Sequence, residues 1–232
     1  MKKEIRNIRV DAKKFAAAAL FRSKEETRYY LNGVYIEPHP DGGVIMVATN
    51  GHQVAVIHDE SGEANAPFIC KASQRFYTAC AKKPADVLKR PGQIHFVGHV
   101  ANLVCEGFDG DPSIIGDCHI EVEYAPDIDG TYPDWRRVLP TIDTQPTIPD
   151  LVGPYFGINA EYVTDFAKAL KILTGVKSAK IITMTVQDRG APIAITSETC
   201  REFLGVLMPA REASERPTLP AWLKEQKKEA VE

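Results

Sequence analysis

Apolar residues recur along the chain at two spacings, one typical of strands and one typical of helices. From Thr27 to Val56, apolar runs are separated by Pro40-Asp41-Gly42-Gly43 and by Asn50-Gly51. Because Gly and Asn adopt positive φ at low cost, both of these short segments are typical of tight turns. The segment therefore predicts an antiparallel meander of three strands, the first of which runs from Thr27 to Glu37.

The same order of elements, strand–helix–three strands, is predicted three times. In the first copy, Asp11 is the expected N-cap of a helix over 11–22 that precedes the meander. In the third copy, Asn159 is the expected N-cap of a helix that Gly175 ends. The remaining predicted elements are a strand over 5–10, a helix over 72–83, and strands over 67–70, 93–99, 100–108, 114–124, 155–159, 179–187, 191–197 and 202–208. The pattern predicts an α+β fold of three repeated half-domain units.

Proline-rich sequence separates the second copy from the third and predicts an extended connector, since proline excludes a long helix. The expected divisions are a complete domain over 1–130 (half-units of about 1–62 and 63–130), the connector over 131–154, a single half-unit over 155–211 and a flexible charged tail over 212–232. Trp222-Leu223 in the tail either packs incidentally or docks on another chain.

Composition narrows the function classes. No apolar run reaches the roughly 20 residues that span a membrane, and no signal peptide is recognised at the N-terminus. Five cysteines without a Cys-x-x-Cys pair favour buried thiols in a reducing, cytoplasmic setting, and their spacing indicates no metal site. No nucleotide-binding or hydrolase motif occurs, so we expect no cofactor and no enzyme activity. His52, His58 and Asp59 are close in sequence, which alone does not support an acid–base site.

Charge is distributed unevenly between the predicted helices and the rest of the chain. The net charge is −3, yet the windows 11–22, 71–83 and 159–177 contain ten basic and three acidic residues, against 18 basic and 28 acidic elsewhere. A single lysine on a helix is usually just solvated. Three helices with the same bias predict one surface that accepts a polyanion.

Four separated segments stand out: 28–33 (Arg-Tyr-Tyr-Leu-Asn-Gly), 47–55 (Val-Ala-Thr-Asn-Gly-His-Gln-Val-Ala), 132–140 (Tyr-Pro-Asp-Trp-Arg-Arg-Val-Leu-Pro) and 203–211 (Phe-Leu-Gly-Val-Leu-Met-Pro-Ala-Arg). In this order they resemble the middle domain, followed by the second half of the last domain, of the bacterial DNA polymerase III β sliding clamp family. Asn50, Gln53, Val54 and Trp135 depart from the family's usual Asp, Arg, Leu and Tyr. The resemblance implies a DNA clamp (processivity-factor) fold.

In that family the four segments form a groove that captures short peptides from polymerases, the clamp loader and repair proteins. Carried over by position, the groove would be lined by Tyr30, Leu31, Thr49, Gly51, His52, Gln53, Val54, Pro133, Arg137, Val138, Val206, Met208, Pro209 and Arg211. Apolar sockets, an adaptable methionine and a glycine suit this role. The alternative is that these residues simply hold two half-domains together.

The helices would face DNA. Phosphate contacts, independent of base sequence, are expected from Lys13, Lys14, Arg22, Arg75, Lys82, Lys83, Lys168 and Lys171.

The sequence thus predicts a non-enzymatic, sliding-clamp-like scaffold for double-stranded DNA and partner peptides. Family rings contain a dozen half-units, so three per chain imply a homo-oligomer, a dimer first and a four-chain ring beyond it. The alternative is a clamp-derived interaction module that binds partner peptides without encircling DNA.

Overall fold

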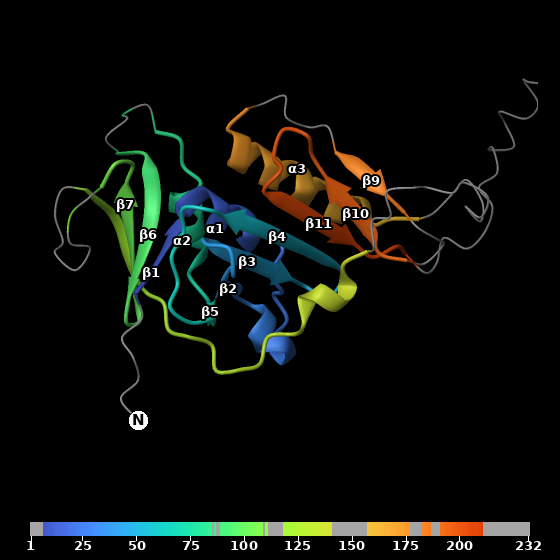
Figure 1. Ribbon diagram of the computed structural model, residues 1–232, viewed down its shortest axis with the longest axis horizontal. Coiled ribbons are helices and arrows are strands. Elements are labelled where there is room, and N and C mark those ends of the chain that lie inside the picture. Colours follow the sequence, from blue (N-terminus) through green and yellow to red (C-terminus); the bar gives the residue numbers. More distant parts are fainter. Residues whose placement is uncertain are drawn as a thin grey trace, which may run out of the picture.

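Two antiparallel sheets form the framework of the protein. The computed structural model describes residues 7–84, 86, 89–108, 110, 118–140, 157–176, 182–186 and 191–210. One sheet has the strand order β1 (Asn7–Asp11), β6 (Pro91–Val97), β7 (Val100–Cys105), β8 (His119–Tyr124). The other has the order β5 (Phe68–Cys70), β2 (Val34–Pro38), β3 (Val44–Thr49), β4 (Gln53–Asp59), β11 (Phe203–Leu207), β10 (Ile193–Thr196), β9 (Thr183–Thr185). The smaller sheet lies at one end of the molecule and the larger one at the other (Figure 1).

Three α-helices begin at side-chain caps. The side chains of Asp11, Ser73 and Asn159 accept hydrogen bonds from the first-turn backbone of α1 (Ala12–Ala19), α2 (Gln74–Cys80) and α3 (Ala160–Thr174) respectively. Gly175 ends α3 in the left-handed conformation at φ +66°. The predicted caps Asp11 and Asn159 and the predicted stop at Gly175 are confirmed.

The first two predicted copies exchange their opening strands. Strand β1 pairs with β6 of the next copy, and β5 pairs with β2 of the previous one. The opening strand of each copy therefore makes its backbone hydrogen bonds with a strand of the other copy. In the last copy α3, β9, β10 and β11 lie in order. Its expected opening strand at 155–159 is not formed at 157–159, and residues 155 and 156 lie outside the described residues.

Strand β11 pairs antiparallel with β4, so a strand from the end of the described chain lies in the same sheet as strands from near its start. Val206 stands opposite Val54, and Leu204 opposite Val56. The helices cover one face of this sheet: α1 contacts β2, β3 and β4, and also contacts α2 and α3. An aromatic group in the core between the helices and this sheet consists of Phe21, Phe166 and Phe203.

Other residues of the same strands form a second, smaller hydrophobic cluster. It contains Val47, Val54 and Val206 together with Tyr132 and Trp135 of the connector. In the described part of the connector, a short 3₁₀ helix, η3 (Trp135–Val138), breaks the predicted extended run. The segment from η3 back to β8 runs along the outside of the larger sheet (Figure 1).

The prediction that a strand begins at Thr27 is wrong. Residues Glu26–Leu31 form η1, two short 3₁₀ turns separated by a kink at Arg28, and β2 begins at Val34. Asn32 explains the difference, because its backbone N–H donates to Tyr29 O at 3.0 Å and its side-chain amide donates to Glu25 O at 3.1 Å. These local bonds close a turn that a strand would have to open. Strands expected over 100–108 and 179–187 are also shorter, ending at Cys105 and confined to Thr183–Thr185 among the described residues.

Candidate functional site

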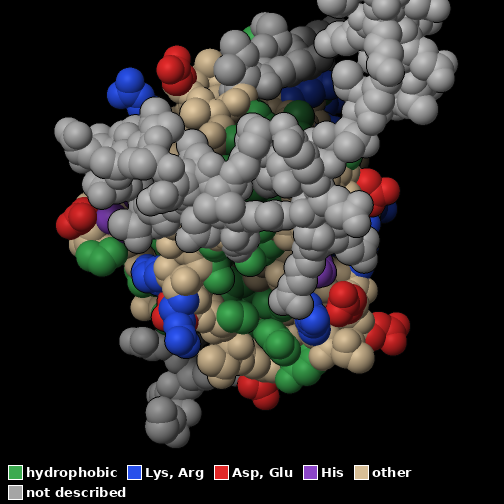
Figure 2. Space-filling view, turned by 90° about the vertical axis from the view of Figure 1, so that its right-hand side faces the viewer, with side chains coloured by type: hydrophobic (Ala, Val, Ile, Leu, Met, Phe, Trp, Pro, Cys, Tyr) green, Lys and Arg blue, Asp and Glu red, His purple; other side chains and the backbone are tan. Residues whose placement is uncertain are grey.

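An apolar cavity of about 240 Å³ opens where β4 and β11 meet the connector. Its lining comes from all four of the segments singled out in the sequence: Leu31, Thr49, Gly51, His52, Gln53, Val54, Tyr132, Pro133, Asp134, Trp135, Val138, Val206 and Met208. We call it the groove. Hydrophobic side chains gather on this end of the molecule, with Lys and Arg side chains to both sides (Figure 2).

The first wall of the groove is the turn between β3 and β4. Asn50 Oδ1 accepts hydrogen bonds from the backbone N–H groups of His52 and Gln53, both at 3.0 Å. Thr49 Oγ1 accepts from Gly51 N at 3.0 Å and donates to Gln53 O at 2.8 Å. Gly51 has φ +89°, a conformation that glycine adopts with the least strain. The turn therefore holds His52 and Gln53 in fixed positions.

The second wall is the end of β11. Met208 N donates to His52 O at 2.9 Å, which ties this wall to the turn. Val206 is buried, whereas Met208 exposes 39% of its surface. A flexible, partly exposed thioether beside a buried valine suits an apolar ligand side chain.

The third wall is the connector, where Asp134 caps η3. Tyr132 stacks flat on Tyr35, with ring centroids 4.7 Å apart, and its hydroxyl donates to Val47 O at 3.4 Å. Burial raises the pKa of the Tyr132 phenol, so it stays a neutral donor. The Trp135 indole lies under the Arg136 guanidinium at 4.2 Å.

Helix α3 supports the groove from the side of the helices. The rings of His52 and Tyr162 stack with centroids 5.8 Å apart. One turn further along α3, Asp165 Oδ2 accepts a hydrogen bond of 3.1 Å from Gln53 Nε2, and Asp165 Oδ1 accepts one of 3.0 Å from Lys168.

Most of the residues expected in a groove are brought together. Ten of them line the cavity: Leu31, Thr49, Gly51, His52, Gln53, Val54, Pro133, Val138, Val206 and Met208. Tyr30, Arg137 and Pro209 lie outside the lining, and Arg211 lies outside the described residues. Sequence reasoning missed Tyr132, Asp134 and Trp135. Their position beside Pro133 in one short segment was the available signal.

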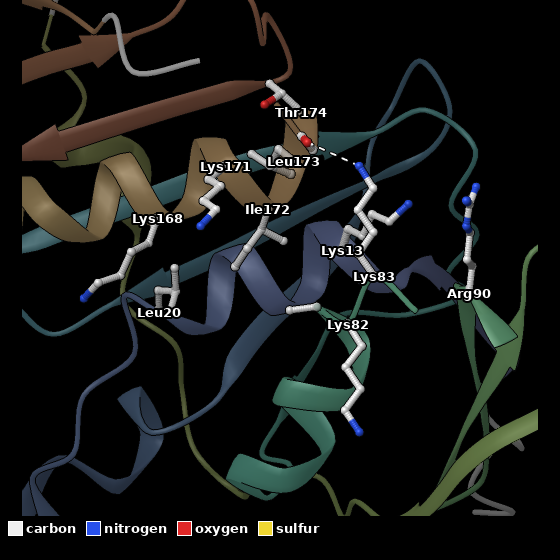
Figure 3. A pocket seen from close by; sticks show the side chains of 12 residues that line it. Lys13, Leu20, Lys82, Lys83, Arg90, Lys168, Lys171, Ile172, Leu173 and Thr174 are labelled. Carbon is white, nitrogen blue, oxygen red and sulfur yellow. Dashed lines mark hydrogen bonds between the residues drawn. The ribbon is translucent and has the colours of Figure 1, made fainter. Parts of the chain in front are cut away.

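A second, basic cavity of about 690 Å³ lies among the three helices. We call it the basic cleft; its lining is Lys13, Leu20, Ala81, Lys82, Lys83, Arg90, Lys168, Lys171, Ile172, Leu173, Thr174 and Gly175. Apolar side chains form its floor, and Lys83 reaches across to donate to Gly175 O at 3.4 Å (Figure 3). Lys13 pairs with Glu106 at 3.0 Å. No described residue bonds to the ammonium groups of Lys82 and Lys171, which are exposed. This arrangement attracts anions.

Three of the expected DNA contacts lie away from the basic cleft. Lys14 donates to His58 O at 3.1 Å and has a side chain only 18% exposed. Arg22 bonds Ala19 O and Gln74, and Arg75 bonds Glu121. Conversely, Arg90 lines the cleft although it follows the predicted helices, so the charge count over helical windows missed it.

Nothing in the described part of the chain assembles an acid–base or metal site. The buried Asp59 carboxylate accepts hydrogen bonds from Asp11 N at 2.7 Å and Ser61 Oγ at 2.9 Å. His58 and His52 have separate ring partners, His39 and Tyr162. Across the described ranges, no three His, Cys, Asp or Glu residues are placed to hold a metal ion, and no helix is long and apolar enough to cross a bilayer.

Comparison with known sequences identifies distant relatives. No family model matches the chain. The β sliding clamps of two Caulobacter vibrioides strains are each 29% identical to it over 128 residues, 51% of this chain and 29% of the relative. The matched region thus spans less than a third of those relatives.

Solved structures of sliding clamps share the fold over most of this chain. The DNA polymerase III β-subunit clamp of Bartonella birtlesii bound to griselimycin has a TM-score of 0.57 and 22% identity, and the match covers 90% of this chain and 66% of that one. The Pseudomonas aeruginosa clamp has a TM-score of 0.58 and 15% identity, over 88% and 66%. The Caulobacter crescentus clamp, with polyethylene glycol at a proposed β-motif tethering region, has a TM-score of 0.52 and 17% identity, over 91% and 67%.

The chain is therefore a distant homologue of bacterial β sliding clamps over part of their length, with an α+β structure that matches theirs. Sliding clamps are not enzymes, which agrees with the expected lack of enzyme activity.

Proposed function

We propose that this protein is a sliding-clamp-like scaffold that holds duplex DNA without reading its sequence and presents the groove to short peptides of polymerase or repair proteins. The observation that carries the proposal is the convergence of Leu31, Gln53, Trp135 and Met208 on one apolar cavity across the β4–β11 junction. Apolar sockets beside fixed backbone groups are what linear peptides bind.

The basic cleft is the proposed contact with DNA. Lys82 and Lys171 are its most available cations, because they are exposed and unpaired within the described residues. Contacts of this kind neutralise phosphates, weaken with salt and permit sliding. Such a scaffold would act in the cytoplasm and need no cofactor.

The proposed organisation is three half-units: a complete domain over 1–130, a connector over 131–154, a single half-unit over 155–211 and a tail over 212–232. Among the described strands, β9 forms one edge of the larger sheet, and an exposed edge is a site of strand pairing. Two copies joined at their single half-units would form a dimer, and four chains would supply the dozen half-units of a ring.

A second candidate is an interaction module that binds partner peptides without encircling DNA. The intramolecular partners of Lys14, Arg22 and Arg75 favour it, because three expected phosphate contacts are already engaged. Light scattering and retention on circular against linear DNA separate the two functions. Oligomers retained longer on circular DNA support the clamp, and a monomer retained equally on both supports the module.

Griselimycin, to which the Bartonella birtlesii clamp is bound, is the test ligand for the proposed groove. Calorimetry should show binding that weakens about tenfold with Met208→Ala or Leu31→Ala, since each removes an apolar contact. Val122→Ala is the matched control, because Val122 is as exposed as Met208 but lies on β8. Equal loss in all three variants contradicts the groove assignment.

A further inference from the structure

Two cysteines face each other across neighbouring strands of the smaller sheet. Strands β7 and β8 pair antiparallel with Val104 opposite His119, and continuing this register by one residue places Cys105 opposite Cys118. The backbone N–H of Cys105 donates to Cys118 O at 2.9 Å, so the two residues form a directly opposed, hydrogen-bonded pair. Residues opposed in this way carry their side chains on the same face of a sheet. The two thiols are therefore neighbours.

The spacing of the pair fits a disulfide bond. The Cα atoms of a hydrogen-bonded antiparallel pair are about 5.5 Å apart, and disulfides join Cα atoms that are roughly 4.4–6.8 Å apart. The side chains already meet: burial, together with a hydrogen bond to the Cys118 side chain, raises the pKa of the Cys105 thiol above its ordinary value. The strands therefore need no change of register for the two sulfur atoms to bond.

The two thiols differ in their access to solvent. All five cysteines lie within the described residues, and Cys118 is the exposed one, whereas Cys105 is only 6% exposed. The expectation of buried thiols is thus wrong for Cys118. An exposed thiol meets an oxidant first, and a buried thiol beside it then completes the reaction. The other three, Cys70, Cys80 and Cys200, are buried, so reagents reach them only when the fold opens.

We propose that Cys105 and Cys118 are a redox modification site, at which a small disulfide such as oxidised glutathione converts the thiol pair into a reversible cross-strand disulfide. The Cys118 thiolate attacks one sulfur of the small disulfide, whose S–S bond breaks and releases one thiol. Cys105 then loses its proton to water, and its sulfur attacks Cys118 Sγ and displaces the second thiol. In sum the protein gives up two hydrogen atoms, and the small disulfide is reduced to two thiols.

The pair adjoins the basic cleft. Glu106 directly follows Cys105, its carboxylate pairs with Lys13 at 3.0 Å, and its backbone N–H donates to Arg90 O at 2.9 Å. Lys13 and Arg90 both line the basic cleft. A bond between Cys105 and Cys118 would restrain the strand end that carries Glu106, and with it the carboxylate that neutralises Lys13. The modification itself does not depend on the proposed function of the groove or of the basic cleft.

Incubation of the reduced full-length chain in mixtures of reduced and oxidised glutathione tests the proposal. After acid quenching and alkylation in denaturant, the intact mass should show the loss of two hydrogen atoms, with the other three of the five cysteines alkylated. Residues 106–117 contain Glu106 but no Lys or Arg. A glutamate-specific protease therefore cuts between the two cysteines, and the resulting peptides should stay joined until a reductant is added.

Single variants separate the two steps of the reaction. Cys105→Ala should stop it after the first step and leave one glutathione attached to Cys118. Cys200→Ala is the matched control, because Cys200 is 4% exposed and thus as buried as Cys105. It should form the disulfide as the wild type does. Cys118→Ser should keep its four thiols, since the remaining cysteines are buried.

Three results on the wild type would overturn the proposal. A glutathione adduct that persists on Cys118, or a covalent dimer through Cys118, would show that Cys105 does not reach Cys118 Sγ. The same holds if all five thiols survive in oxidised glutathione alone. If Cys105→Ala does not fold, as judged by thermal unfolding, the wild type and Cys118→Ser decide the question, because a hydroxyl in place of an exposed thiol leaves the core intact. A disulfide that still forms in Cys118→Ser contradicts the assignment.

Discussion

Gly205 of β11 lies directly under the ring of Phe166 in α3. A Cβ atom at Gly205 would stand 2.7 Å from Cδ1 of that ring and closer still to Cε1. The ring also contacts Phe21 and Phe203, at centroid distances of 4.9 and 6.3 Å. The absence of a side chain at one position thus sets how closely α3 approaches the sheet.

Gly205→Ala should destabilise the protein by about 1–3 kcal/mol, because the added methyl group overfills a packed core. Urea unfolding measures the change. Phe166→Leu should reduce the cost of Gly205→Ala, since leucine leaves room for the methyl group. Additive effects of the two substitutions would show that they do not share this contact.

Gly51→Ala should weaken griselimycin binding and cost roughly 1–2 kcal/mol of stability, because alanine is strained at φ +89°. Gly42→Ala is the matched control: Gly42 has φ +105° in the β2–β3 turn, with no atom within 4 Å of its built Cβ. It should cost similar stability and leave binding intact. Equal loss of binding in both variants would mean that stability, rather than the turn beside the groove, is being measured.

Lys82→Gln and Lys171→Gln should weaken retention on duplex DNA and together reduce the slope of log affinity against log salt by about 2. Lys71→Gln, which removes an exposed lysine outside the basic cleft, is the control for net charge. Titrations at several salt concentrations measure the slope. The basic cleft is not the DNA contact if Lys71→Gln changes the slope as much as either cleft variant.

The stability of the smaller sheet should fall as the pH drops below 7. Burial, with the nearby charge of Arg9, lowers the pKa of His95 below its ordinary value of 6.5. The unfolded chain then takes up a proton more readily than the folded one, so stability is full above pH 6.5 and is lost as the pH falls from there through the lower pKa of the folded His95. Urea midpoints from pH 8 to pH 5 should fall less for His95→Gln. Parallel curves for the two proteins would refute the assignment.

Local signals in the sequence were sufficient for much of the fold. Asp11, Asn159 and Gly175 mark helix ends through bonds to their own neighbours, and no distant contact was needed to recognise them. The strand predicted over Thr27–Leu31 was also judged from local sequence, and it was wrong. The apolar residues there suggested a strand, whereas Asn32 forms local hydrogen bonds that close a turn. Where two local patterns predict different elements, the sequence alone does not show which of them forms.

The candidate site was predictable where its residues belonged to a family-like segment. Tyr132 and Trp135 also belong to such a segment, but they were left out of the expected lining, because their place in it depends on how the connector folds over the larger sheet. Arg90 joined the basic cleft from a position outside the predicted helices, and Lys14 was drawn instead to His58 O and Asp59. Neighbouring lysines on one helix thus make different contacts, and the tertiary structure determines which contacts each one makes.

The main-chain pairing of β4 with β11 also has a kinetic consequence. Two walls of the groove are neighbouring strands of one sheet, so their spacing is fixed by backbone hydrogen bonds before any ligand arrives. A ligand therefore meets a site that needs little reorganisation. Association should proceed in a single fast step for every peptide that fits, and differences between peptides should lie in how long each one stays bound.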